Sequence, residues 1–245
     1  MFLINPYIFQ ASGNSLWNGL QAYYTADNTP NDALGTYNGT LTNGATYGTG
    51  IINQGFSFDG VNDYVNLGDN LDIRLDSWTY NFWINMDTIN RNNSILTKSD
   101  TSSNWERWWY IVNTSNQLEF HLQNPLQANN VTTRKYFRST QTLSASTWYM
   151  VTMVLDRTDK AYMYINGTPE PIISTDGNFT PITNELSSWS ALDFNRTFNC
   201  CIGNFSTVNY SFDGIIDEGG IWNRVLSASE VTELYNSGAA KQYPN

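Results

Sequence analysis

The sequence contains few cysteines, histidines and charged residues, on which many folds and reactions depend. Only two of its 245 residues are cysteine, and these two, Cys200 and Cys201, are adjacent. Neighbours on a strand point to opposite faces, so a disulfide between them would be strained. We therefore expect two reduced cysteines, and nothing requires an oxidising compartment. His121 is the only histidine, which excludes metal sites with several histidines and leaves only single-histidine variants of a catalytic site.

Charged residues are scarce as well, and most of those present are acidic. They make up 14% of the chain, with 22 Asp and Glu against 12 Lys and Arg, for a formal charge of −10. An acidic chain without a cluster of Lys and Arg is a poor partner for nucleic acid or an anionic membrane. No apolar run approaches the roughly 20 residues of a transmembrane helix, so membrane insertion is not expected. The N-terminus lacks a basic region and a clear cleavage site, and we do not interpret it as a signal peptide.

Apolar residues and aromatic rings are abundant, at 40% and 15% of the chain, which is enough for a sizeable core. Many segments alternate with period two, as a half-buried strand does. In residues 78–86 one face would carry Trp78, Tyr80, Phe82, Ile84 and Met86. The other face would carry Thr79, Asn81, Trp83 and Asn85, and its polar residues predict that it is solvated, with Trp83 as the exception.

Further strands are expected at 118–122 and in a hairpin formed by residues 148–155 and 160–165. Asn166 and Gly167 then suit a type I′ turn. Residues 124–146 and 168–198 are interpreted mostly as loops and turns. The last segment predicts a helix, with a capping box between Ser227 and Glu230, a hydrophobic staple between residues 226 and 231, and Gly238 as its left-handed end.

About a dozen short strands with one terminal helix predict an all-β fold, in which two antiparallel sheets form a sandwich or jelly roll. We divide the chain into an N-terminal arm, residues 1–15, and one domain, residues 16–245. There is no internal repeat at a fixed period.

Several segments together resemble the laminin G-like domains of the concanavalin A-like lectin/glucanase superfamily, especially the bacterial and phage type. They are residues 19–24, 56–65, 78–84, 148–167 and 212–227, and the resemblance covers roughly residues 16–238. It implies two curved antiparallel sheets packed face to face, a concanavalin A-like jelly roll. It does not fix a function, because such domains bind sugars or proteins and serve as appendages of enzymes and virions.

The carboxylates do not point to catalysis. Glycoside hydrolases of the superfamily carry a Glu-x-Asp-x-x-Glu cluster on one strand, and the nearest run here, residues 213–218, lacks that pattern. Hydrolysis of a glycosidic bond needs two facing carboxyl groups a set distance apart. We therefore predict that the protein is not an enzyme, and a polysaccharide hydrolase or lyase is the least favoured alternative.

A structural calcium ion is one hypothesis for the acidic turns. The resemblance suggests that Asp27, Asp32 and Asp217 could meet at the rim of the sheets, where an Asn/Asp/Gly turn can also supply carbonyl oxygens. The alternative is that these residues cap turns by bonding to their own backbone. The turn at residues 59–63 is a second, weaker candidate.

A carbohydrate site would need aromatic faces beside planar polar side chains. The candidates are Trp83, Trp108, Tyr110, Glu119, His121, Tyr162 and Tyr164. The alternative for each is ordinary packing in the core or at its rim. A basic-aromatic patch at residues 134–138 could meet an acidic partner, or it could be a solvated loop.

The N-terminal arm is the candidate anchor, through Phe2, Leu3, Ile4, Tyr7, Ile8 and Phe9. An apolar, proline-containing lead could dock on a partner protein by strand addition, or it could be a frayed terminus. Without a signal peptide, an adhesin-type domain fits a phage virion protein, assembled in the host cytoplasm and displayed on the virion surface. We favour a non-catalytic adhesive or structural module of this kind, a head decoration or a fibre component. The alternative is a bacterial, lectin-like carbohydrate-binding protein, extracellular or at the cell surface, and a homo-oligomer stays open.

Overall fold

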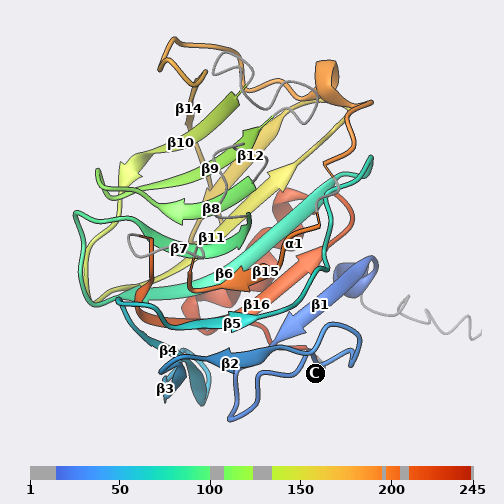
Figure 1. Cartoon of the computed structure of the whole chain (residues 1–245). Helices are drawn as coiled ribbons and strands as arrows, with labels where there is room; N and C mark the ends of the chain where they lie inside the picture. Colours follow the sequence, from blue (N-terminus) through green and yellow to red (C-terminus); the bar gives the residue numbers. More distant parts are fainter. Residues whose placement is uncertain (1–14, 100–107, 124–133, 195–196, 205–209, 244–245) are drawn as a thin grey trace, which may run out of the picture.

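The computed structural model describes residues 15–99, 108–123, 134–194, 197–204 and 210–243 (Figure 1). Within these ranges the chain forms two antiparallel eight-stranded sheets and one α-helix. The order of sheet A is β13 (Thr168–Glu170), β12 (Ala161–Ile165), β11 (Trp148–Leu155), β6 (Trp78–Met86), β16 (Asp213–Trp222), β4 (Gln54–Asp59) and β3 (Thr46–Thr49), with β1 (Leu20–Tyr24) also paired to β16. The order of sheet B is β14 (Ile172–Thr175), β10 (Arg134–Thr142), β9 (Gln117–Gln123), β8 (Trp108–Val112), β7 (Asn93–Lys98), β15 (Cys200–Ile202), β5 (Tyr64–Asn66) and β2 (Thr40–Thr42). The predicted jelly-roll sandwich is confirmed.

The main core lies between the two sheets. The face of β6 predicted to be apolar points into it, and Tyr80 stacks against Trp108 and Phe120 of sheet B at ring-centroid distances of 5.4 and 5.9 Å. Large rings and aliphatic side chains from both sheets fill the layer between them, and burial of this apolar area stabilises the interface. Cys200 and Cys201 are both buried on β15 with free thiols, as predicted.

A second core lies on the outer face of sheet A, which we had predicted to be solvated. Helix α1 (Ala228–Tyr235) lies against this sheet on the side away from sheet B (Figure 1). Trp83 is buried there and stacks on Tyr235 at 5.7 Å between ring centroids. The prediction was wrong because the covering helix follows the strand by about 145 residues in the chain, and the period of the strand carries no signal for it.

The polar residues on this covered face are buried with hydrogen-bond partners. The Thr79 hydroxyl donates to the carbonyl of Arg224 at 2.7 Å and accepts from the amide of Leu226 at 3.1 Å. The Thr152 hydroxyl donates to Asn81 Oδ1, also at 2.7 Å. Buried polar groups are tolerated when they are paired in this way, so Thr79 joins β6 to the segment that leads into α1, and Asn81 joins β6 to β11.

The predicted start of α1 is confirmed, and its predicted end is wrong. Ser227 accepts from the Glu230 amide, and the Glu230 carboxylate accepts from the Ser227 amide, which is the capping box. The helix ends at Tyr235, where Asn236 takes the left-handed conformation with φ of 47°. Asparagine tolerates this region better than most residues, and it ends the helix two residues before Gly238.

Two segments predicted to be loop are strands of sheet B, β10 and β14. Strand β10 escaped the period-two analysis because Arg134, Lys135 and Ser139 put polar side chains on both of its faces. The predicted type I′ turn is confirmed, since Asn166 and Gly167 both have positive φ, of 51° and 73°, between β12 and β13.

The candidate anchor residues Phe2, Leu3, Ile4, Tyr7, Ile8 and Phe9 lie outside the described residues. Among the described helices, none has both the length and the apolar character needed to cross a membrane.

Candidate functional site

The outer face of sheet B carries a row of stacked rings. Trp109 on β8, His121 on β9 and Tyr136 on β10 lie directly opposite one another in the strand register. The His121 ring is 4.4 Å from each neighbouring ring between centroids. Phe179 extends the row beyond Tyr136 at 5.9 Å, and Tyr210 extends it beyond Trp109 at 5.8 Å. Five rings from three strands and two connecting segments thus form one aromatic ladder.

A second row, which contains an ion pair, runs beside this ladder, two residues along the same strands. Ile111, Glu119 and Arg138 lie opposite one another on β8, β9 and β10. Arg138 Nε donates to Glu119 Oε2 at 2.5 Å, and Asn113 Nδ2 donates to the same oxygen at 3.0 Å. The pair is largely desolvated, with 13% of the Arg138 side chain and 7% of the Glu119 side chain exposed.

The Arg138 guanidinium lies over two rings of the ladder. Its Cζ atom is 4.9 Å from the centroid of Tyr136 and 5.2 Å from that of Phe179. Its Nη1 group donates to the hydroxyl of Thr175 on β14 at 3.0 Å. Stacking on two aromatic faces and two hydrogen bonds hold this cation in one orientation.

A groove with a volume of about 600 Å³ lies over the two rows. Arg134 and Tyr136 line it from β10, the turn after β8 contributes Asn113, and β9 contributes Gln117. Phe179 also lines the groove, with 66% of its surface exposed. The groove therefore joins exposed aromatic surface to oriented amide, carboxylate and guanidinium groups. Pockets for small ligands commonly combine these features.

Of the seven predicted carbohydrate-binding residues, Glu119 and His121 lie on this face. Glu119 lines the groove. His121 is fully buried within the ladder, so its ring offers no open face to a ligand. Sequence reasoning missed Trp109, Phe179 and Tyr210, and it noted Tyr136 and Arg138 only as part of the basic-aromatic patch.

Trp108 and Tyr110 are corrected, because both lie in the core between the sheets. They are 1% and 0% exposed, and they pair with Leu122 and Phe120 of the neighbouring strand. The run 108–110 has aromatic rings at both parities, so its period could not tell the inner face from the outer one.

The other three candidates are not on the sheet that carries the groove. They are Trp83, Tyr162 and Tyr164, which lie on sheet A, in or beside the second core. Trp83 is 3% and Tyr164 is 7% exposed, which leaves little surface for a ligand. Tyr162 is more exposed, and its hydroxyl donates to Asp159. These three residues therefore do not form one site with Glu119 and His121.

The predicted metal ligands are engaged by N–H donors. The Asp32 carboxylate accepts from the amides of residues 23, 34, 36 and 37, at 2.9 to 3.1 Å. Asp217 accepts from the amides of residues 51, 52 and 218. Asp27 accepts from the amide of residue 54 and from the side chains of Asn53 and Gln242. Capping of a local turn, which was our alternative for these residues, accounts for the bonds of Asp32 to residues 34, 36 and 37, whereas Asp27 and Asp217 accept mainly from segments far away in the chain.

No group of three or more His, Cys, Asp or Glu side chains in the described ranges is arranged to hold a metal ion. The second candidate turn is likewise bonded to backbone amides, because Asp63 accepts from those of Gly44 and Asp59. The calcium ion stays a prediction, without a set of ligands among these residues.

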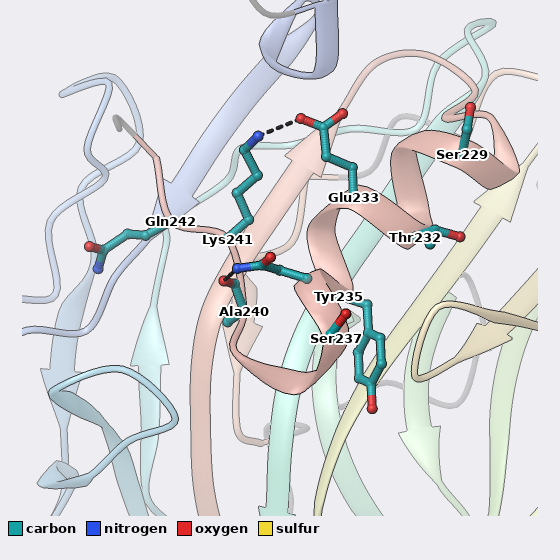
Figure 2. A pocket seen from close by; sticks show the side chains of 9 residues that line it. Ser229, Thr232, Glu233, Tyr235, Ser237, Ala240, Lys241 and Gln242 are labelled. Atoms are coloured by element: carbon teal, nitrogen blue, oxygen red, sulfur yellow. Dashed lines mark hydrogen bonds and ion pairs between the residues drawn. The ribbon is translucent and has the colours of Figure 1, made fainter.

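Figure 2 shows a second hollow, of about 650 Å³, at the C-terminal end of α1. Its rim is crossed by an ion pair between Lys241 and Glu233, and Asn236 Nδ2 donates to the carbonyl of Ala240. Its one aromatic residue, Tyr235, is already stacked on Trp83. With its polar groups paired and its ring covered, this hollow is the weaker candidate for a binding site.

Comparison with known proteins identifies the family. A laminin G family model, described as the Concanavalin A-like lectin/glucanases superfamily, matches residues 59–232, which is more than half of the chain. A search of curated protein sequences gives no match.

The fold is similar to that of several solved binding domains. Domain 4 of AbnA, a GH43 extracellular arabinanase from Geobacillus stearothermophilus solved with arabinotriose, is 16% identical with a TM-score of 0.62, over 91% of this chain and 98% of that one. The binding domain of botulinum neurotoxin DC, solved with rat synaptotagmin II, is 15% identical with a TM-score of 0.63, over 91% of this chain and 52% of that one. The ligand binding domain of botulinum neurotoxin serotype D, solved with N-acetylneuraminic acid, is 17% identical with a TM-score of 0.56, over 89% and 51%.

The chain spans nearly all of the arabinanase domain and about half of each toxin domain. At these identities the likeness shows the fold alone. The family match over residues 59–232 shows that the chain belongs to the concanavalin A-like lectin/glucanase superfamily.

Proposed function

We propose that this protein is a non-catalytic glycan-binding domain and that its ligand binds in the groove on the outer face of sheet B. The observation that carries the proposal is the aromatic ladder beside the Glu119–Arg138 pair at the floor of one groove. Aromatic surface suits the C–H faces of sugar rings, and oriented polar groups suit their hydroxyls. The arabinotriose and N-acetylneuraminic acid in two of the similar structures are consistent with a sugar ligand.

The arrangement of carboxylates supports a binding role over hydrolysis. Glu119 is the only carboxylate among the described residues that line the groove, and Arg138 is bonded to it. Asp217 and Glu218 lie on sheet A, each 1% exposed. A two-carboxylate mechanism needs both groups at the substrate, and this groove offers one.

For the biological setting, we retain a phage virion protein, a head decoration or fibre component that displays the sandwich for contact with host glycans. Residues 1–15 would join it to other virion proteins. Deleting residues 1–15 should abolish incorporation into the particle while glycan binding persists. Normal incorporation of the truncated protein would refute the arm as the anchor, and absence of the full chain from purified particles would favour the alternative, a bacterial lectin-like protein at the cell surface.

The experiment that tests glycan binding is an array screen of the full chain and of the Phe179→Ala variant. Phe179 is 66% exposed, so its loss should leave stability unchanged and weaken glycan binding about tenfold, as expected for one stacking ring. Val61→Ala removes an exposed apolar side chain that does not line the groove, and it serves as the matched control. Equal binding by all three proteins would move the site elsewhere, and no binding at all would refute the proposed function.

A further inference from the structure

The Glu119–Arg138 pair leaves two polar atoms available to a ligand. Glu119 Oε2 accepts from both Arg138 and Asn113, whereas Glu119 Oε1 has no hydrogen-bond partner in the described part of the chain. Arg138 uses Nε toward Glu119 and Nη1 toward Thr175, and its Nη2 has no acceptor among the same residues. Both side chains line the groove. The groove floor therefore presents an acceptor and a donor from adjacent strands.

These two atoms are held in place before any ligand arrives. Glu119 and Arg138 are directly opposite one another across β9 and β10, so the sheet fixes the spacing of their backbones. The stacking of Arg138 over Tyr136 and Phe179 fixes the guanidinium, and Asn113 fixes the carboxylate. A site held in this way loses little conformational entropy when it binds.

A sugar hydroxyl both donates and accepts, so adjacent hydroxyls match a carboxylate oxygen beside a guanidinium N–H. The pair has no net charge, because Glu119 offsets Arg138. A sugar carboxylate placed here would meet the negative charge of Glu119 at close range, in a site with little water to screen it. Arg134, the other cation of the groove, lies four residues along β10, and its Nε donates to Gln123 at 2.8 Å.

On the basis of the proposed function, we propose that the Glu119–Arg138 pair is the specificity subsite and that it binds two adjacent hydroxyls of an uncharged sugar ring. Tyr136, Phe179 and Tyr210, the rings of the ladder with appreciable exposed surface, supply contact area for neighbouring parts of the glycan. The ligand class is thus a neutral oligosaccharide of hexoses or pentoses, rather than a uronic acid polymer or a sialylated glycan.

The test compares neutral oligosaccharides (arabino-, xylo-, manno- and galacto-oligosaccharides) with oligogalacturonides and sialyllactose, using the full chain and the Glu119→Gln variant. The substitution keeps an amide oxygen that can accept but removes the negative charge, so Arg138 is no longer offset. Affinity for the neutral ligand should fall about tenfold, and affinity for the acidic ligands should rise. Glu170→Gln, in a carboxylate that accepts from the amides of residues 140 and 141 and does not line the groove, is the control and should change neither affinity.

A structural role for Glu119 would weaken binding of all ligands alike, so the reversed preference separates the two roles. Thermal unfolding of the variant checks that it is folded, and Arg138→Lys gives a second variant that should weaken neutral binding because one ammonium cannot serve Glu119, Thr175 and a ligand together. A wild-type preference for acidic glycans, or an unchanged preference in Glu119→Gln, would overturn this inference and leave the proposed function standing. No binding to any glycan would instead overturn the proposed function itself.

Discussion

Replacing Glu218 by glutamine should flatten the dependence of folding stability on pH. Asp217 and Glu218 are neighbours on β16, where one extra residue opposes β6 between Asp217 and Gly220. This bulge, with φ of 46° at Glu218, lets both carboxyl groups contact the elements that cover the outer face of sheet A. Two acids that would point to opposite faces of a regular strand are therefore buried side by side.

The contacts of the two carboxyl groups differ. Asp217 accepts from the backbone amides that follow β3. Glu218 accepts from the Tyr23 hydroxyl at 2.5 Å and from Gln242 Nε2 at 2.8 Å, so it joins β1 to the C-terminal segment. Burial, followed by the charge of Glu218, raises the pKa of Asp217 to about 8. Burial likewise raises the pKa of Glu218 to about 7.

A carboxyl group whose pKa is raised on folding binds more protons in the folded than in the unfolded chain. Stability is then highest below the unfolded pKa, falls as pH rises, and levels off above the folded pKa. For Glu218 the shift from 4.5 to about 7 corresponds to about 3 kcal/mol, at about 1.4 kcal/mol for each pH unit. Asp217 extends the loss to about pH 8.

The glutamine variant removes one of the two charges and lowers the repulsion on the other. The fall in unfolding free energy between about pH 5 and about pH 8 should therefore be roughly halved relative to wild type. Urea unfolding at about one-unit pH steps measures it, with constant m-values as the check on two-state behaviour. Glu233→Gln removes a surface carboxylate paired with Lys241 and should leave the slope unchanged. A flat wild-type profile over this range, or an unchanged slope in the Glu218 variant, would refute the reasoning.

Three further predictions concern the packing around the sheets. Trp222→Phe should lower the unfolding free energy by about 2 kcal/mol, because the buried indole fills the second core and donates to the carbonyl of Leu16; a change near zero in urea unfolding would contradict this role. Ser227→Ala should lower the unfolding free energy by about 1 kcal/mol through loss of the capping box with Glu230. Amide hydrogen exchange in the first turn of α1 should then become faster, and an unchanged exchange rate would contradict the role of the cap. Asp32→Ala should lower the unfolding free energy by about 3 kcal/mol, because it leaves four backbone amides without their acceptor. If these amides are the only partners of Asp32, added calcium should not change the Tm of the wild type. A calcium-dependent rise in Tm would instead support the ion that the sequence suggested.

Local chemistry determined a large part of this structure. The alternation of Trp78, Tyr80 and Phe82 was enough to orient β6, because only one face of that strand carries apolar side chains at every position. The capping box and the Asn166–Gly167 turn depend on the conformations of a few neighbouring residues, so they could be predicted without knowing the fold. The order of these segments along the chain also indicated the family, and the match over residues 59–232 confirms it.

The tertiary structure decided which surfaces are open. The alternation of apolar and polar residues indicates that a strand has two different faces. It does not indicate which other part of the chain covers the more polar face. Trp83 and Tyr164 could not be excluded from a binding surface until α1 and the C-terminal segment were seen to cover them. We predicted the wrong face for Trp108 for a similar reason, because an unbroken run of aromatic residues is compatible with either face of the strand pointing inward.

The groove itself depends on strand register, which joins residues far apart in the chain. Trp109, His121 and Tyr136 form one ladder only because the register of β8, β9 and β10 places them opposite one another. Phe179 joins the ladder from a segment about 40 residues later in the chain. Register depends on the packing of whole sheets and on turn geometry rather than on any one segment. The sequence by itself therefore determined the sandwich and its family, while the position of the groove followed from pairings that only the folded sheets specify.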